Sequence, residues 1–417
     1  MNKKVNANRE LRLARWLTAF HLGIALGYLG LIIKAAIDGL LWRADFTAFY
    51  TGGAIVRQGL GPHLYDLNLQ ARVQQAILGP GRMFYDGVLP FYNPPHFALV
   101  MVPFSLLPLG LAFWCWTALQ VVILDRVIQR LRSMSSGWDA TERWLLFSAF
   151  LAFFPLFLQF LYGSLSLFVL WCLIEFYLAF REGKEARAGV WLALAAVKLQ
   201  AALFPALVIL AGRRWRALTS AGAAGVLILG ATSALLGPSI WPADYFHWLN
   251  VTSGYFDRFG VYPEMMYNLK GTLVLLWGTE RAFLIQAVSM GALVAGAVGI
   301  LALWARGHWA PHQPASDLRL AFTLTLGVLL SPHQNPQDSL TLVLPLALFY
   351  DYLRRTGQPT RPLTAFLLTW PVLFLLEQFA ICGRMGIRLP VVLVTALLVW
   401  MGVQGLSPGK PTTSGGE

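Results

Sequence analysis

Long apolar runs alternate with short polar segments along almost the whole chain, and this pattern predicts helices that cross a membrane. A bilayer core is spanned by about 20 apolar residues in a helix. The predicted crossings are 16–37, 109–131, 144–160, 163–180, 217–236, 281–305, 320–332, 338–353, 362–380 and 388–406. Residues 96–107 are expected to form a short helix that does not cross alone, and 188–212 to enter and return on one side.

The composition agrees with this pattern. Of 417 residues, 57% are hydrophobic and 12% are charged, and 16 are tryptophan. Soluble domains carry about 25% charged residues. The chain is therefore predicted to be an all-α polytopic membrane protein, a single integral membrane domain over 1–417 with about 10–13 transmembrane or re-entrant helices. The net charge of +12 does not indicate nucleic-acid binding, because the basic residues form short clusters between apolar runs.

These basic clusters set the predicted orientation, since cytoplasmic loops are enriched in Lys and Arg. The basic N-terminus precedes the first apolar run without a clear cleavage site, so we expect a retained anchor and not a removed signal peptide. Three stretches are then external, about 38–95, 237–270 and 331–338, and the tail 407–417 is expected to be disordered. The clusters placed inside contain Arg126, Arg130, Arg132, Arg181, Lys184, Arg187, Arg213, Arg214, Arg216, Arg306, Arg319, Arg354, Arg355 and Arg361.

The first external stretch is too long to be a simple connector. From Phe49 to Leu78 apolar residues recur at helical spacing, with Arg57, Asp66, Arg72 and Gln74 between them. This spacing favours amphipathic helices that lie along the bilayer surface. The stretch ends in "FYNPPHF", where prolines interrupt the helix.

A lysine lies deep in the predicted re-entrant segment. Lys198 is ten residues from Ala188, which is about 15 Å at 1.5 Å per residue. Such a charge costs about 2.5 to 3.5 kcal/mol on insertion and is usually paired or faces a polar cavity. We therefore expect two half-length helices that meet near Lys198. The lysine is either a site for an anionic group or a structural partner of an intramembrane acid such as Glu175.

A polar sequence, "SPHQNPQD", separates two apolar runs at residues 331–338. A plain connector does not need His, Gln, Asn and Asp together, although Asp338 could cap the following helix. The stretch is either a polar turn or a loop that faces a ligand. The other external stretch, 237–270, is rich in aromatic residues, which suit either an interfacial belt or the stacking of rings on sugars.

Four motifs in this order resemble glycosyltransferase family 87, over about residues 40–350. They are "DFTAFYTGGAIVRQGLGPHLYD" after the first helix, "YNPP", "VKLQ" followed by "RRWRA", and "SPHQNPQDSLTLVLP". Two places differ from the usual pattern. "YGSLS" at 162–166 stands where such proteins often have Gly-Gln-x-Asn, and Leu199 follows the lysine where proline is common.

The resemblance implies a GT-C fold and a membrane glycosyltransferase of the cell inner (plasma) membrane, with its active site on the extracytoplasmic side. The donor would be a polyprenyl-phosphate sugar, with mannose as the sugar, and the acceptor an envelope glycolipid or glycan. In GT-C enzymes an acid at the start of the first external loop is the general base, and Asp45 has that position. Asp38 is the second candidate, and Asp45 could instead be an ordinary interfacial acid.

The same chemistry predicts the remaining site residues. A departing lipid phosphate needs cations, and the candidates are Lys198, Lys270, His333 and Arg258. No cofactor or metal is expected, because one phosphate can be neutralised by Lys and Arg. The expected substrate-binding residues are Tyr50, Arg57, Tyr92, Asn93, His96, Gln200, Asn268, Gln334 and Asp338.

Two other classes of protein have to be compared with this hypothesis. A lipid or glycan flippase would also contain broken helices and a lysine near the membrane midplane. However, the halves of the chain show no internal repeat, and the polar residues cluster in the external loops. A scaffold without catalytic activity gives no reason for Asp45, Lys198 and His333 to share a cavity, so their placement distinguishes these classes.

Overall fold

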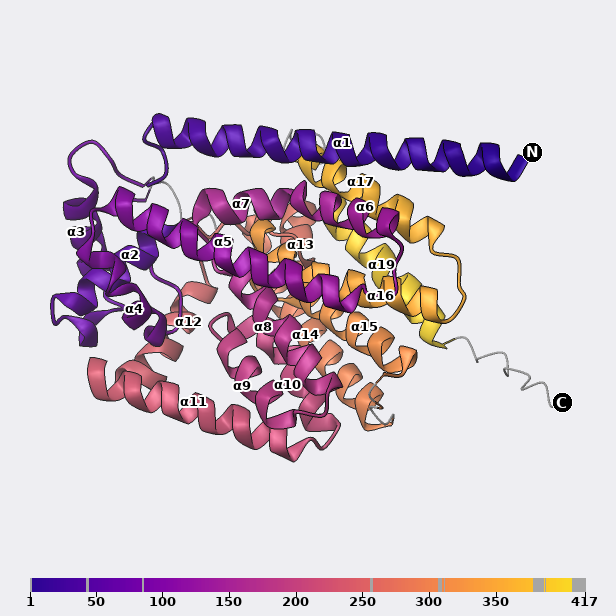
Figure 1. The fold of residues 1–417 in the computed structure, drawn as a ribbon. Coiled ribbons are helices and arrows are strands. Elements are labelled where there is room, and N and C mark those ends of the chain that lie inside the picture. The colour runs from indigo at the N-terminus through magenta and orange to yellow at the C-terminus, as the bar shows by residue number, and fades with distance from the viewer. Residues whose placement is uncertain are drawn as a thin grey trace.

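The structure is a computed structural model that describes residues 2–42, 45–84, 86–255, 258–306, 310, 312–377, 386 and 388–406. In these ranges the regular secondary structure is helical, apart from one isolated β-bridge between Arg258 and Val261. The predicted disordered tail, 407–417, lies outside the described residues. The helices form an elongated bundle with α1 along one side (Figure 1).

The helices follow the predicted runs closely. The longest are α1 (Asn2–Ile37), α5 (Leu109–Met134), α11 (Trp215–Leu236) and α14 (Ala282–Ala305). The others of the bundle are α6 (Ala140–Leu151), α7 (Phe154–Tyr162), α8 (Ser166–Arg181), α9 (Glu185–Ala195), α10 (Leu199–Ala211), α15 (Pro314–Leu330), α16 (Val343–Arg355), α17 (Arg361–Glu377) and α19 (Leu389–Leu406). Shorter helices are α2 (Asp45–Arg57), α3 (Leu67–Leu78), α4 (Pro95–Met101), α12 (Tyr245–Ser253), α13 (Leu269–Trp277) and the 3-10 turn η6 (Pro336–Leu342).

Four helices are long and apolar enough to cross a membrane: Ala14–Ile37, Leu109–Met134, Trp215–Leu236 and Thr279–Ala305. The pair α6 and α7, bent by 44°, would be a fifth span. Large apolar side chains such as Val226, Leu227 and Phe283 are mostly exposed on these helices, as expected where lipid covers them. The protein is therefore a multi-pass membrane protein. The other predicted crossings coincide with helices of 13 to 18 residues, and their crossing stays a prediction.

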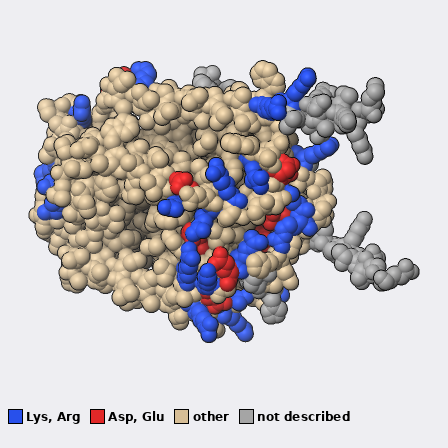
Figure 2. Space-filling model, in the orientation of Figure 1, with Lys and Arg blue, Asp and Glu red and all other residues tan. Residues whose placement is uncertain are grey.

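Ion pairs join the basic clusters that were predicted to lie inside. Glu175, on the last turns of α8, pairs with Arg130 of α5 at 2.5 Å and with Arg187 of α9 at 2.7 Å. Figure 2 shows Lys and Arg side chains gathered, with interspersed acids, over one end of the molecule. Helices α2, α3 and α4 lie at the opposite end in Figure 1. This charge asymmetry matches the predicted orientation.

Residues 185–214 form a helical hairpin. Helix α9 stops at Ala195 and α10 starts at Leu199, so the predicted break near Lys198 is confirmed. The ends of the hairpin meet, because Arg214 Nη1 lies 3.1 Å from Glu185 Oε1. Gly189 lets α9 approach α11 closely, since a Cβ there would lie 2.1 Å from the Ala217 carbonyl oxygen. The hairpin therefore enters the bundle and returns to the end from which it came.

This hairpin gives a topology prediction. Lys184 and Arg213 flank it and are exposed. In a background without Cys115, Cys172 and Cys382, the variants Lys184→Cys and Arg213→Cys should both react with a membrane-impermeant maleimide from the cytoplasmic side alone. Labelling of the two positions from opposite sides would exclude a re-entrant hairpin.

The first external stretch contains two helices, α2 and α3, followed by α4 after Pro94. Only α3 is amphipathic as expected, because residues 46–55 of α2 are buried on every face of the helix. Asp66 caps α3 by accepting hydrogen bonds from the backbone N–H groups of Asn68 and Leu69. The prediction that Gln74 lies on the polar face of this segment is wrong, because its side chain is buried in the structure. Its amide forms hydrogen bonds with both backbone groups of Leu89, at 3.0 and 2.8 Å. A buried backbone segment needs such partners, and α3 thereby holds the chain that leads to Tyr92 and Asn93.

Candidate functional site

A cavity of about 480 Å³ lies where α2, the tip of the hairpin and the loop 331–338 meet. The segment 89–94 and helices α12, α13 and α14 complete its wall. Among the predicted site residues it is lined by Asp45, Tyr92, Asn93, Lys198, Gln200, Lys270, His333 and Asp338. These predicted residues come from five separate parts of the chain and converge on one space. The predicted base and three of the four predicted phosphate-binding residues are among them.

Asp45 is the first residue of α2, where the unpaired backbone N–H groups and the helix dipole favour a negative charge. Its Oδ2 accepts a hydrogen bond of 3.1 Å from Gln337 Nε2. Burial raises the pKa of Asp45, while the charge of Lys198 and the Gln337 hydrogen bond act in the opposite direction. A carboxylate with a raised pKa is a better proton acceptor than an ordinary surface aspartate.

Lys198 is at the tip of the hairpin, as the residue that precedes α10. Its Nζ donates to Asp338 Oδ1 and, at 3.1 Å, to Ser166 Oγ. The Ser166 hydroxyl donates to the same Asp338 oxygen at 2.5 Å. Glu175 is therefore not the partner of Lys198, since it belongs to the ion pairs at the other end of α8. An ammonium has three N–H donors, so one of them is left to face the cavity.

The loop 331–338 is both a turn and a wall of the cavity. Asn335 and Asp338 form a reciprocal capping box at the start of η6, in which Asp338 Oδ2 accepts from the Asn335 backbone N–H. Asp338 is thus the third residue of that turn and not the N-cap of the next helix. One carboxylate oxygen shapes the loop and the other binds Lys198. The segment is therefore a polar turn that also lines the cavity, and that it faces a ligand stays a prediction.

His333 and Lys270 differ in the charge that they can supply. Burial lowers the pKa of His333 to about 4, so at neutral pH its imidazole is neutral and can donate one hydrogen bond. Lys270 is 6% exposed, and burial lowers its pKa as well. The lowered pKa favours a neutral hydrogen-bond donor at His333, and its binding of phosphate stays a prediction.

Six of the predicted site residues do not line this cavity. Asn268 caps α13 and donates to the Ser331 carbonyl oxygen, so it positions the loop. Gln334 lies beside Lys198 in an adjoining cavity of about 30 Å³. His96 is half-buried on α4, and burial lowers its pKa to about 4.

The other three residues lie farther from the site. Arg258 is exposed and stacks on the Tyr255 ring, 5.0 Å from its centroid. Tyr50 and Arg57 line a separate groove on α2. Of the aromatic residues in the second external stretch, Tyr245 lines the cavity, while Trp248 packs between Tyr65 and Tyr92.

Several residues of the wall were missed by the sequence reasoning. Gln337 binds Asp45, and its place next to Asp338 in the polar loop was the available signal. Ser164 and Ser166 belong to "YGSLS", the segment that differs from the family pattern; Ser164 lines the cavity and Ser166 the adjoining smaller one. Gln286 and Ser289 come from α14, whose apolar sequence gave no indication of a site.

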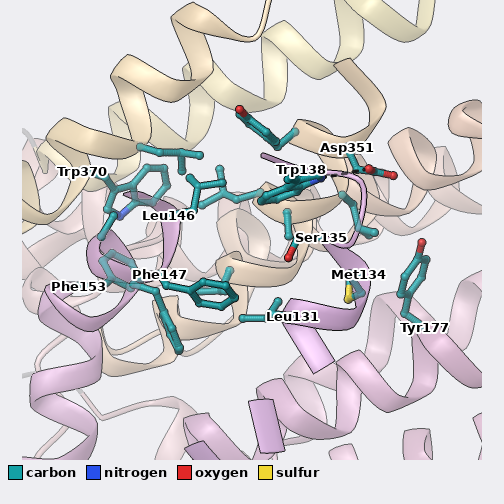
Figure 3. Close-up of a pocket in the computed structure, with 18 of the residues that line it drawn as sticks. Leu131, Met134, Ser135, Trp138, Leu146, Phe147, Phe153, Tyr177, Asp351 and Trp370 are labelled. Carbon is teal, nitrogen blue, oxygen red and sulfur yellow. Dashed lines mark hydrogen bonds between the residues drawn. The ribbon is translucent and has the colours of Figure 1, made fainter. Parts of the chain in front are cut away.

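Another pocket, of about 90 Å³, lies between α5, α6, α8, α16 and α17 (Figure 3). Its wall is mainly aromatic and aliphatic, with Phe147, Phe153 and Trp370 around it. Asp351 there accepts a hydrogen bond from Trp138 Nε1 at 3.3 Å. None of the predicted site residues lines this pocket, so it is separate from the candidate site.

Within the described ranges, no group of three or more His, Cys, Asp or Glu residues is arranged to hold a metal ion. Metal independence stays a prediction. The site thus combines two carboxylates, Asp45 and Asp338, with cationic and neutral hydrogen-bond donors in one cavity of a multi-pass helical bundle. These groups belong to a multi-pass membrane protein whose cavity has ammonium and imidazole groups suited to binding an anionic ligand.

Comparison with known proteins gives the family. The model of glycosyltransferase family 87 matches residues 91–332, more than half of the chain, so the protein belongs to glycosyltransferase family 87, a GT-C type family. The predicted all-α polytopic fold of GT-C type is thereby confirmed. Lys198 and Lys270 lie within the match, whereas Asp45 precedes it and His333 follows it by one residue.

One curated relative is the polyprenol-phosphate-mannose-dependent alpha-(1-2)-phosphatidylinositol pentamannoside mannosyltransferase of Mycolicibacterium smegmatis. It is 28% identical over 291 residues, which are 65% of this chain and 66% of that protein. The alignment therefore covers slightly less than two thirds of the relative.

Proposed function

We propose that this protein transfers mannose from a polyprenyl-phosphate donor to an envelope glycolipid or glycan, with inversion, at the extracytoplasmic side of the plasma membrane. The observation that carries the proposal is the convergence of Asp45, Lys198, Lys270 and His333 on one cavity. The family, and the name of the mannosyltransferase that the chain resembles, support the donor. The acceptor class rests on the same relative.

Asp45 is the general base in this proposal. The acceptor hydroxyl oxygen attacks the anomeric carbon, its proton passes to an Asp45 carboxylate oxygen, and the bond from the anomeric carbon to the phosphate oxygen breaks. Attack opposite the leaving group inverts the anomeric configuration. Only one carboxylate is needed, because the leaving lipid phosphate is already a stable anion. A positioned base contributes about 10² to 10⁴ in rate.

The negative charge that develops on the leaving phosphate is stabilised by Lys198 and Lys270, and His333 supplies a neutral hydrogen bond. Because Asp338 already neutralises Lys198, the pair brings little net charge. Such a pair can still bind a phosphate, since the third N–H of the ammonium is oriented by the two bonds to Asp338 and Ser166. Orientation before the reaction is what makes charge stabilisation effective in a catalytic site.

A lipid-borne donor is supported by one wall of the cavity. Leu203 of α10 and Met290 and Leu293 of α14 line it. The same helix α14 carries exposed apolar residues, and Met290 is itself 43% exposed. A polyprenyl chain can therefore stay against apolar side chains while its phosphate reaches Lys198. The external position of the site is supported by the basic clusters at the opposite end of the bundle (Figure 2).

Gln337 is expected to tune the base. Its hydrogen bond favours the charged form of Asp45, so Gln337→Leu should raise the pKa of Asp45 further. The rising limb of the activity–pH profile should then move to higher pH, while activity on the high-pH plateau is largely retained. Gln200→Leu, which removes a cavity glutamine bonded to the His333 carbonyl oxygen and not to Asp45, is the control and should leave the limb in place. An unmoved limb in Gln337→Leu would show that this hydrogen bond does not act on the base.

The proposed function is tested by incubating the purified protein with several polyprenyl-phosphate sugars and total envelope lipid, and by detecting a new glycolipid by mass. We expect a product one hexose heavier, formed with polyprenyl-phosphate mannose. No mass change with any donor, combined with movement of labelled lipid across proteoliposome membranes, would support a flippase instead.

A further inference from the structure

The groove lined by Tyr50 and Arg57 lies between α2 and α3 and is separate from the cavity that contains Asp45. Its volume is about 370 Å³, and it is lined by Tyr50, Ala54, Arg57, Gln58, Leu69, Arg72, Val73, Ala76 and Ile77. The two sites share α2, because Asp45, Ala48 and Phe49 face the cavity whereas Tyr50, Ala54 and Arg57 face the groove. One helix thus forms a wall of both.

The floor and the rim of the groove differ in chemistry. Ala54, Leu69 and Val73 form a buried apolar floor, at 1 to 9% exposure. The Tyr50 hydroxyl is not available to a ligand, because it donates to the Leu107 carbonyl oxygen at 2.7 Å. Exposed side chains at the rim are two arginines, Arg57 and Arg72, with Gln58 beside them.

The charge of the rim is uncompensated. The lining contains no acidic residue, and in the part of the chain that the structure describes neither Arg57 nor Arg72 takes part in an ion pair. The arginines at the opposite end of the bundle behave differently, since Arg130, Arg187 and Arg214 are each paired with a glutamate. Guanidinium groups bind phosphate oxygens through two parallel hydrogen bonds and are suited to that ligand.

We propose that this groove binds an anionic phospholipid of the outer leaflet, with its phosphodiester between Arg57 and Arg72 and acyl carbons along the apolar floor. A free phosphate would use the arginines but leave the floor uncovered, whereas an amphiphile occupies both. Helix α3 is amphipathic, with Arg72 on its exposed face, and such a helix is the kind of element that holds a protein to an anionic bilayer surface. The proposal does not depend on the transferred sugar or on Asp45.

The test is a native mass spectrometry titration of the purified full-length protein with three probes. Phosphatidylglycerol supplies both parts of the ligand, diacylglycerol lacks the phosphate, and inorganic phosphate lacks the chains. We expect phosphatidylglycerol to bind at least about tenfold more tightly than either of the others, because charge-assisted hydrogen bonds and apolar burial act together.

Three variants locate the site. Arg57→Gln/Arg72→Gln should weaken phosphatidylglycerol binding at least about tenfold. Arg82→Gln/Arg281→Gln removes the charges of two exposed arginines, one in the first external stretch and one at the start of the predicted crossing 281–305, and should leave binding unchanged. Ala76→Trp fills the groove, keeps both arginines and should weaken phosphatidylglycerol binding without affecting inorganic phosphate. All replaced side chains are exposed, so unchanged thermal unfolding is expected to show that the fold is intact.

Several results would overturn the proposal. Unchanged phosphatidylglycerol binding in Arg57→Gln/Arg72→Gln would exclude the groove. Equal weakening in the Arg82→Gln/Arg281→Gln control would indicate attraction by surface charge in general. Full binding in Ala76→Trp, with displacement of the lipid by inorganic phosphate, would leave a site for a free anion and not for a lipid.

Discussion

Asp45→Asn is expected to lower turnover by about 10²- to 10⁴-fold while donor affinity is nearly unchanged. The amide keeps the size of the side chain and can still accept a hydrogen bond from Gln337, but it cannot take the proton of the acceptor hydroxyl. Turnover is measured with polyprenyl-phosphate mannose and acceptor lipid, and donor affinity by a separate titration.

The control is Asp38→Asn, which should have little effect. Asp38 is bound to Lys34 at 2.6 Å, on the turn after α1, and does not line the cavity. In the wild type, activity should rise with pH through the pKa of Asp45, at higher pH than for an ordinary aspartate, because burial raises that pKa. Near-normal turnover of Asp45→Asn would contradict the proposed base.

Lys198→Met is expected to lower the stability of the protein by about 3 kcal/mol and to weaken donor binding. The cost arises because Asp338, whose side chain is 7% exposed, loses its cation and stays buried with a negative charge. Unfolding in detergent measures the first effect, and titration with the polyprenyl-phosphate donor measures the second.

Lys198→Met/Asp338→Asn separates the two effects. Neutralising both partners should restore most of the stability, since no unpaired charge is left, but donor binding should stay weak because the phosphate still lacks its ammonium. If donor affinity returned together with stability, Lys198 would be a structural partner of Asp338 and not a phosphate ligand.

The break at Lys198 could be predicted because it follows from local physics, namely a charge in an apolar segment with basic flanks. The residue that pairs with Lys198 could not be predicted from the sequence. Asp338 is 140 residues away, and Glu175 was equally plausible while the packing of α8 was unknown. Identifying the true partner requires knowing that η6 packs beside the start of α8, which no periodicity in either segment reveals.

The position of Tyr50 and Arg57 was predictable in part. At 3.6 residues per turn they point about 140° and 120° away from Asp45 around the helix axis, so one helix face could not hold all three. The burial of Gln74 was not predictable in this way, because the spacing of α3 places a polar residue there and only the return of residues 89–91 covers it.

The wall that α14 contributes to the cavity has a consequence for kinetics. A donor that reaches Lys198 past Met290 and Leu293 arrives by lateral diffusion in the leaflet. The concentration that governs saturation is then the mole fraction of donor in the membrane. Inert lipid added at a constant bulk concentration of donor lowers the mole fraction of donor in the membrane. The rate of transfer should therefore fall, although the bulk concentration has not changed.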